Sequence, residues 1–187
     1  MRVVVTEFVT LDGVMEDPGG AEKTPNGGWA FRFERGPEGD KFKLEELMAA
    51  DAQLLGRRTY EGFAAAWPSM KDEVGFAERM NSMPKYVASN TLQNGSWNNT
   101  TILRGNVVDE IKKLKQAQGR DILVAGSAQL VQALAQAQLV DEYRLMIFPI
   151  VLGSGKRLFT EGLPATPLKI VESQPMAAVL TLRLQPA

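Results

Sequence analysis

The strongest constraint on the fold of this chain is the regular alternation of short apolar runs with helical patterns. The segment AQLLGRRTYEGF (52–63) shows it in brief, because a buried-strand pattern ends at Gly56 and a helical pattern follows at once. Strand patterns occupy 2–10, 52–56, 85–89, 100–105, 121–126 and 141–153, and helical patterns occupy 40–50, 58–67, 74–83, 106–119 and 127–138. This alternation predicts an α/β fold with a mostly parallel sheet and helices on both faces.

Local signals mark the ends of several of these elements. Asp40 is the expected N-cap of the helix at 40–50, and Asn106 is the expected N-cap of the helix at 106–119. Pro149 indicates an edge strand or a bulge. Residues 167–185 form two strand patterns around a turn at Gln174–Pro175, which predicts a C-terminal antiparallel hairpin.

Length and composition exclude several classes of protein. The 187 residues fit a single domain spanning 1–187. A net charge of −1 does not suit a nucleic-acid binder. The chain has no Cys and no His, so disulfides, thiolate nucleophiles and the usual transition-metal ligands are all missing, and we expect no metal. We see no signal peptide and no apolar run of about 20 residues, which predicts a cytoplasmic protein without a membrane partner.

Two strand–glycine–helix junctions could bind a phosphate group. In LLGRRTYE, Gly56 precedes a helix start that carries Arg57 and Arg58, and guanidinium groups match phosphate oxygens. In VAGSAQL, Gly126 and Ser127 open a second helix in the same way. Each junction alone favours an ordinary turn. Together, in one parallel sheet, they would lie at the carboxyl ends of the strands, where such sheets bind ligands.

Two further loops carry candidate residues. In VASNTL, Ser89 and Asn90 could bind a ribose or its phosphate, or could simply form a turn. In TLDGVMEDPGG, Asp12 could orient a substrate, or could belong to a solvated acidic loop. GSGKR (153–157) matches neither the Walker motif nor the dinucleotide fingerprint, so any dinucleotide would be held without the usual Rossmann turn.

Taken together, five segments resemble the dihydrofolate reductase-like superfamily, and above all the stand-alone reductases similar to the C-terminal domain of the bifunctional riboflavin-biosynthesis deaminase/reductase. The segments are VTLDG, LLGRRTYEGF, YVASNTL, ILVAGSAQLVQAL and DEYRLMIFPIVLGSGKRLF, and they span about residues 2 to 160. The resemblance implies a three-layer fold, NADPH as cofactor and a homodimer. It implies cofactor-binding roles for Thr6, Gly56, Arg57, Arg58, Thr59, Ser89, Asn90, Gly126, Ser127, Ala128 and Gln129.

The substrate is less defined. Dihydrofolate reductases hold the pterin with an acidic residue on the first helix, and here Glu38 or Asp40 is offered at a spacing that does not match. We expect an NADPH-dependent reductase that transfers a hydride to a small heterocyclic, pterin- or pyrimidine-like, or carbonyl substrate, with Asp12 as the catalytic candidate. The alternatives are a non-catalytic nucleotide-binding or interaction protein on this fold, and a ribosylaminopyrimidine reductase of riboflavin biosynthesis.

Overall fold

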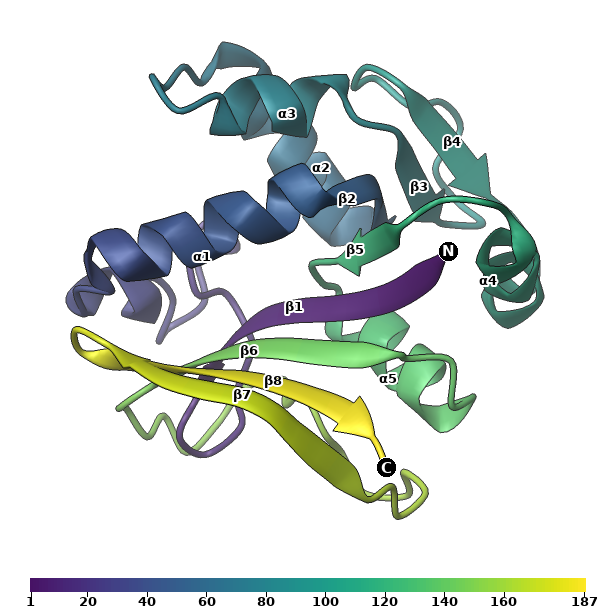
Figure 1. Ribbon diagram of the computed structural model, residues 1–187. Helices are drawn as coiled ribbons and strands as arrows, with labels where there is room; N and C mark the ends of the chain where they lie inside the picture. Colours follow the sequence, from purple (N-terminus) through teal and green to yellow (C-terminus); the bar gives the residue numbers. More distant parts are fainter.

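A single eight-stranded sheet organises the computed structural model, which describes residues 1–187 (Figure 1). The strand order is β4-β3-β2-β5-β1-β6-β8-β7. The strands are β1 (Arg2–Thr10), β2 (Ala50–Gly56), β3 (Lys85–Ala88), β4 (Thr100–Leu103), β5 (Asp121–Val124), β6 (Glu142–Phe148), β7 (Leu168–Met176) and β8 (Val179–Pro186). From β4 to β6 every neighbouring pair is parallel, and β8 then pairs antiparallel with both β6 and β7. The mostly parallel sheet and the C-terminal hairpin are therefore confirmed.

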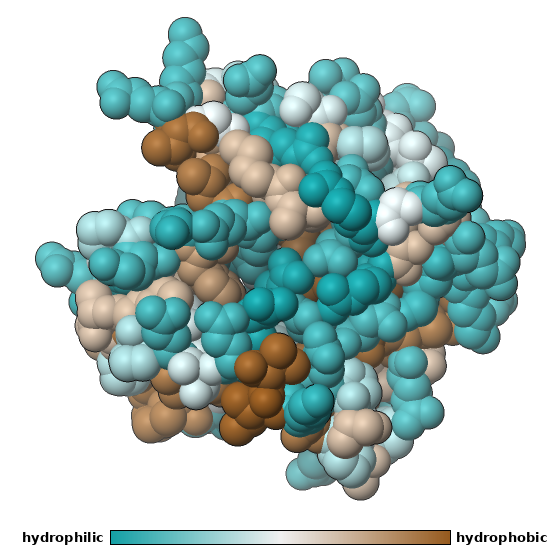
Figure 2. Space-filling model, viewed as in Figure 1, coloured by the Kyte–Doolittle hydropathy of each residue, from teal (hydrophilic) through white to brown (hydrophobic).

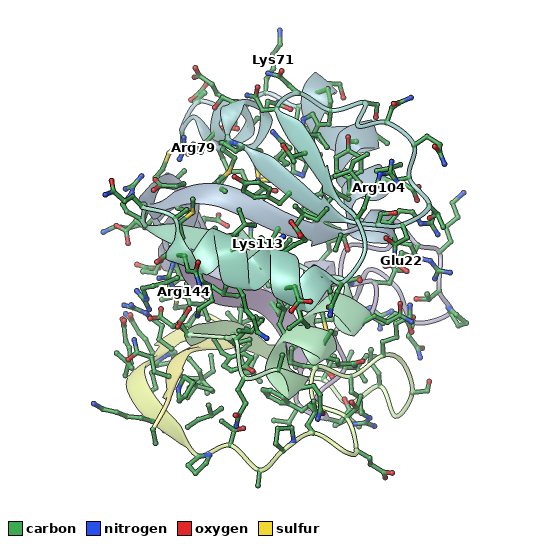
Figure 3. All side chains as sticks on the ribbon, turned by 90° about the vertical axis from the view of Figure 1, so that its right-hand side faces the viewer. Glu22, Lys71, Arg79, Arg104, Lys113 and Arg144 are labelled. Atoms are coloured by element: carbon green, nitrogen blue, oxygen red, sulfur yellow. The ribbon has the colours of Figure 1, made fainter.

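Helices cover both faces of the sheet, as the alternation predicts. The helices are α1 (Gly36–Ala49), α2 (Arg57–Ala66), α3 (Phe76–Ser82), α4 (Val107–Gln116) and α5 (Ala128–Gln136), with short 3₁₀ segments at Trp29–Arg32 and Trp67–Ser69. One core cluster packs α4 and α5 against one face, and a second packs α1, α2 and α3 against the other. Figure 3 shows α4 lying across its face, with the exposed Lys113 on its outer side.

The alternation of side chains along β1 sets the two cores. Val3, Val5 and Val9 face α4 and α5, whereas Val4 points to the opposite cluster. A strand buried on both faces in this way carries β-branched residues at successive positions. Tyr60 of α2 completes the second core, because its hydroxyl accepts a hydrogen bond from the buried Trp97 backbone N–H at 2.8 Å.

Three local expectations are wrong. Helix α1 begins at Gly36 with Pro37 in its first turn, so Asp40 is not the N-cap and instead pairs with Arg35. Pro149 follows the end of β6, which is an internal strand, and so it ends the strand rather than marking an edge or bulge. Gln174 and Pro175 lie within β7, and the turn falls at residues 177–178. The edge position of β7 tolerates the missing proline N–H.

The sheet opens beside β1. Strand β5 pairs with β1 only from Arg2 to Val5, whereas β6 pairs with β1 as far as Thr10. Beyond Val5 no strand therefore pairs with β1 on the β5 side. We call this opening the fork, and define it by residues 6–8 on β1 and residues 125–127 after β5. It lies at the carboxyl ends of the parallel strands, where open α/β sheets bind ligands.

No helix is long and apolar enough to cross a membrane. No group of three or more His, Cys, Asp or Glu side chains is placed to hold a metal ion.

Candidate functional site

The two glycine junctions meet at the fork and interlock. The Gly56 N–H donates a hydrogen bond to the Gly126 carbonyl at 3.2 Å. A Cβ on Gly56 would lie 2.3 Å from Ser127 Oγ, and one on Gly126 would lie 2.8 Å from Thr59 Oγ1. Gly126 also has φ of +76°, a conformation that favours glycine, and its peptide bond to Ser127 is cis. The glycines are therefore required for the close approach of the β2–α2 and β5–α5 junctions.

Both helices that start here begin without a side-chain cap. The N-cap of α2 is Gly56, which has no side chain, and Ser127 makes no capping hydrogen bond to α5. Two other helix starts are occupied, since Asp72 accepts from the first N–H groups of α3 and Asn106 caps α4 as predicted, whereas α1 also begins without a side-chain cap. The free N–H groups and the positive dipole ends of α2 and α5 thus converge on one place, which suits an anion.

The two adjacent arginines differ in their surroundings. Arg57 is exposed and forms a hydrogen-bonded ion pair with Glu61 on its own helix, at 3.0 Å between Nη1 and Oε1. Arg58 has no ion-pair or hydrogen-bond partner. Its charge acts on Lys156, whose pKa it lowers against the stronger, raising effect of a hydrogen bond to Glu16. Arg58 is therefore an unpaired cation in the first turn of α2, close enough to Lys156 for the two like charges to repel.

A groove of about 370 Å³ runs along the first turn of α5. It is lined by Ala128, Gln129, Gln132, Gly155, Lys156, Arg157 and Thr160. The groove thus joins two predicted cofactor-binding residues, Ala128 and Gln129, to two cations that the sequence reasoning left unassigned. GSGKR is not a Walker motif, but its Lys156 and Arg157 do face a helix start.

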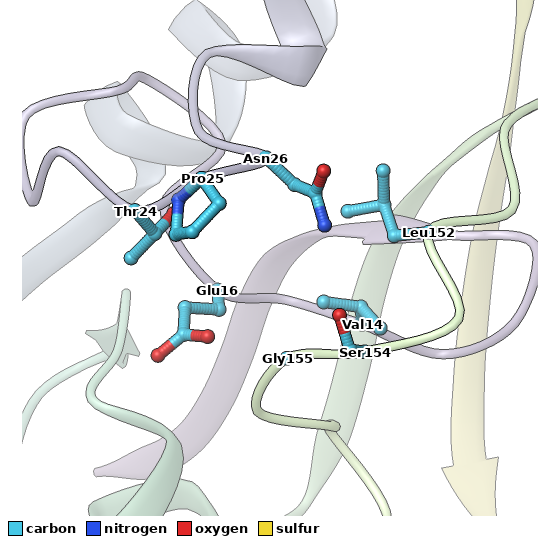
Figure 4. A pocket seen from close by; sticks show the side chains of 8 residues that line it. All are labelled: Val14, Glu16, Thr24, Pro25, Asn26, Leu152, Ser154 and Gly155. Atoms are coloured by element: carbon cyan, nitrogen blue, oxygen red, sulfur yellow. The ribbon is translucent and has the colours of Figure 1, made fainter.

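The acidic loop that follows β1 holds these two cations. Lys156 forms ion pairs with Glu16 and with Glu22, and Arg157 donates to the Asp12 carbonyl. A pocket of about 80 Å³ separates the two loops, lined by Val14, Glu16, Thr24, Pro25, Asn26, Leu152, Ser154 and Gly155 (Figure 4). Ion pairs and a hydrogen bond therefore hold the loop after β1 against Lys156 and Arg157, and the pocket between the two loops is small.

Asp12 also helps to hold the loop after β1 against residues 152–157. Its carboxylate accepts hydrogen bonds from Thr10 Oγ1 at 2.6 Å and from the Leu152 and Gly153 N–H groups at 3.2 and 2.9 Å. These bonds, led by that from Thr10, lower the pKa of Asp12 to about 2. Asp12 is thus a carboxylate at neutral pH and cannot donate a proton there. Its role in orienting a substrate stays a prediction.

Ser89 and Asn90 lie after β3 and form a turn. Ser89 Oγ accepts from the Thr91 and Leu92 N–H groups, and Asn90 Oδ1 accepts from the Gly105 N–H at 2.7 Å. The turn interpretation of this segment is confirmed. Contact of these two residues with a cofactor stays a prediction.

The α1 side of the fork carries a buried polar cluster. Thr6 Oγ1 donates to Glu46 Oε1 at 2.7 Å and accepts from Lys43 Nζ at 2.6 Å. Lys43 and Glu46 also form an ion pair, with side chains only 17% and 5% exposed. Glu46 Oε2 is buried without a hydrogen-bond partner. Glu46 is therefore the buried acid of α1, whereas Glu38 and Asp40 are exposed.

Glu7 lies on the other side of β1, toward α5. Its Oε1 accepts a hydrogen bond from the Gly126 N–H at 2.5 Å, so the side chain spans the fork. Burial raises the pKa of Glu7 to about 8, against the lowering effects of the Gly126 hydrogen bond and of Lys43. Our sequence reasoning missed both Glu7 and Glu46. Glu7 carried a signal, since it is an acid inside the otherwise apolar run RVVVTEFVT.

Comparison with known proteins identifies the family of this chain. The sequence model of the RibD C-terminal domain matches residues 1–182. The chain belongs to the RibD C-terminal domain family. The RibD C-terminal domain is of the reductase type, so this chain is a reductase-type domain at that coarse level.

The relatives of this RibD C-terminal domain match over most of their length. Two are uncharacterized proteins of Bacillus subtilis (strain 168): YyaP is 32% identical over 92% of this chain and 88% of its own, and YwjB is 28% identical over 90% and 88%. The fold matches a crystal structure from Shewanella sp. PV-4, provisionally named a riboflavin biosynthesis protein, with a TM-score of 0.78. That match is 21% identical and covers 100% of this chain and 99% of the other.

The interlocked glycines give the first testable prediction. Gly56→Ala should lower the free energy of unfolding by about 2 kcal/mol, because the new Cβ must displace Ser127. Gly62→Ala, within the helix that follows Gly56, is the control, since no atom lies within 4 Å of its Cβ. It should raise stability by about 0.5–1 kcal/mol, as expected for an exposed helix interior. Urea unfolding measures both, and equal effects would contradict the close approach.

Asp12 gives a second prediction. The lowered pKa means that Asp12 stabilises the fold above its ordinary pKa of 3.8, and that this contribution is lost as pH falls toward 2. Asp12→Asn should therefore cost about 2 kcal/mol at neutral pH, and its deficit should close between pH 4 and 2. Urea unfolding over a pH series tests this, with the exposed Asp40→Asn as control. A deficit independent of pH would show that the charge of Asp12 is not what fastens the loop.

Proposed function

We propose that this chain is an NADPH-dependent reductase that transfers a hydride to a small heterocyclic or carbonyl substrate. One observation carries the proposal: two uncapped helix starts are brought together by interlocked glycines, with Arg58 in the first turn of α2 and Lys156 in the groove beside the first turn of α5. Membership of a reductase-type family supports the same reaction class. When bound, the nicotinamide would supply the hydride, and the protein would supply position and electrostatics.

The residues at the junctions fit a pyrophosphate. Two glycines keep side chains out of the approach to the helix starts, which would leave the N–H groups of α2 and α5 to donate to phosphate oxygens. Arg58 would add a guanidinium on one side, and Lys156 an ammonium on the other. Arg57 lies outside this pair, and its exposed ion pair with Glu61 is weak enough to exchange for a phosphate. We therefore assign Arg58 to the pyrophosphate and Arg57 to the 2′-phosphate that distinguishes NADPH.

The fork is the proposed place for the nicotinamide and the substrate. The edge of β1 there is not paired with a strand, so its backbone groups would be free to bind the cofactor. Thr6 would border the nicotinamide with its hydroxyl fixed between Lys43 and Glu46. Glu46 keeps one buried oxygen without a partner, and a substrate N–H group would satisfy it. A pterin- or pyrimidine-like ring carries such a group beside its carbonyl.

The direct test is a titration with NADPH followed by tryptophan fluorescence, then NADPH oxidation with a panel of pterins, pyrimidines, ribosylaminopyrimidines and quinones. Tight binding with oxidation by one substrate class would support the proposal. A response to ribosylaminopyrimidines alone would favour the riboflavin-pathway step. Binding without any oxidation would favour a nucleotide-binding protein on the same fold, and absence of binding would refute the cofactor assignment.

The third prediction separates the two arginines. Arg58→Glu should weaken NADPH and NADH alike, by about 10- to 100-fold, because a hydrogen bond to a charged group contributes about 1.5–3 kcal/mol. Arg57→Glu should weaken NADPH much more than NADH, since only NADPH carries a 2′-phosphate. Lys71→Glu, an exposed charge reversal on another loop, controls for long-range charge effects. Equal losses for both cofactors in Arg57→Glu would refute the 2′-phosphate assignment.

We also propose that the chain forms a homodimer through the C-terminal hairpin. Hydrophobic side chains gather over β7 and β8 at the bottom of Figure 2. Ile170 and Val171 on the edge strand are 63% and 44% exposed, and Leu180 on β8 is 38% exposed. An exposed apolar edge strand is a surface that proteins normally cover.

The fourth prediction concerns this surface. Sedimentation velocity should show a dimer for the unmodified chain and a monomer for Ile170→Glu, because a charge would be buried in the interface. Val74→Glu is the control, since Val74 is 62% exposed but lies before α3 and away from the hairpin. A monomeric unmodified chain, or an Ile170→Glu variant that stays dimeric, would contradict the assigned surface.

A further inference from the structure

Glu7 is an ionisable group where strand packing calls for an apolar one. It lies between Val5 and Val9 on the same face of β1, and both of those side chains belong to the core under α4 and α5. Its Oε1 is held by the Gly126 N–H. Its Oε2 has no hydrogen-bond or ion-pair partner and keeps accessible surface, since Glu7 is only partly buried.

Two charges act on Glu7, and both come from α1 on the opposite side of β1. Lys43 favours the carboxylate form and Glu46 opposes it, but these two are already paired with each other. Burial is the largest influence and outweighs the attraction of Lys43, which is why the pKa of Glu7 rises to about 8. At neutral pH the group is therefore a carboxylic acid. Its carbonyl oxygen accepts from Gly126, and its hydroxyl is left at the open oxygen.

No other acid near the fork combines a raised pKa with a carboxyl oxygen that has no partner and keeps accessible surface. Asp12 is a carboxylate held by Thr10 and by backbone N–H groups. Asp17 is likewise held as an acceptor, by the Glu22 and Thr24 N–H groups. Glu46 is bound to Lys43 and Thr6. The chain has no His or Cys that could donate a proton.

We infer that Glu7 is the catalytic acid of this reductase, donating a proton to the substrate from its open carboxyl oxygen. This inference rests on the proposed function. Reduction of a C=O or C=N bond consumes one hydride at carbon and one proton at the heteroatom. The Glu7 O–H bond breaks as the new O–H or N–H bond forms, and the electron pair of the substrate double bond becomes the pair that takes the proton. Glu7 is left as a carboxylate and regains a proton from water.

This role narrows the substrate class. A polarised double bond to oxygen or nitrogen places its electron pair on the atom that needs the acid. The Gly126 N–H holds the carboxyl group at the fork while the proton leaves, and it would stabilise the carboxylate that forms. The inferred substrate is therefore a small ring with a reducible C=N bond, or a carbonyl compound, rather than an acceptor of single electrons.

Glu7→Gln is the sharpest variant, because the amide oxygen can still accept from Gly126 whereas the amide group is no acid. Its melting temperature and NADPH affinity should equal those of the unmodified chain. Single-turnover reduction of the reactive panel member should slow by about 100-fold or more, the usual contribution of a general acid. The unmodified rate should fall as pH rises above about 8, and the variant should lack that limb. Glu7→Leu also loses the hydrogen bond from Gly126, so the difference in melting temperature between the two variants measures the structural contribution of that bond.

A second measurement needs no substrate. Infrared spectra of the unmodified chain should show a protonated carboxyl at pH 7 that ionises near pH 8, and Glu7→Gln should lack it. A carboxylate at pH 7, or an unchanged single-turnover rate in Glu7→Gln, would overturn the inference while leaving NADPH binding intact. Failure of the unmodified chain to bind NADPH would instead remove the proposed function, and the proton-donor role with it.

Discussion

The unequal length of two neighbouring strands is the constraint on which the rest of this site depends. Strand β1 has nine residues and β5 has four, so β1 runs on without a partner on one side. Strand β6 keeps the free part of β1 in place by pairing as far as Thr10. A rigid strand edge next to an open space results, and the junctions after β2 and β5 close over it. A longer β5 would fill the fork and leave no site.

Charge couples the acidic loop to the groove at α5. Lys156 and Arg157 are held by Glu16, Glu22 and Asp12, all of which come from the loop after β1. An anion in the groove would compete with these carboxylates for the same cations. Lys156 would then be shared or released by Glu16, and the loop would lose part of its fastening. The position of the loop and the occupancy of the groove are therefore linked through one ammonium group.

The sequence predicted the sheet, the helix layers and the meeting of the two glycine junctions, because these depend on strong local patterns. What it could not show was which side chains from distant elements share a space. Arg58 and Lys156 lie near each other although they are almost a hundred positions apart in the sequence. Nothing local in GSGKR indicates that Lys156 lies beside the start of α5. Asp40 failed as a cap because Gly36 and Pro37 begin the helix earlier. Glu7 stood out as an acid within an apolar strand pattern, but only its position at the fork indicates a role in the site.

The environment decides what each carboxyl group near the fork can do, although the chemical group is the same. Asp12 is surrounded by donors and stays ionised, and Glu46 is neutralised by an adjacent ammonium. Glu7 accepts from one backbone N–H and has an opposing carboxylate nearby, and burial raises its pKa, so it keeps its proton. A chain without histidine can therefore obtain an acid that works near neutral pH by placing a glutamate on a buried strand. Burying this glutamate destabilises the fold locally, at the same unpaired edge of β1 that forms the site.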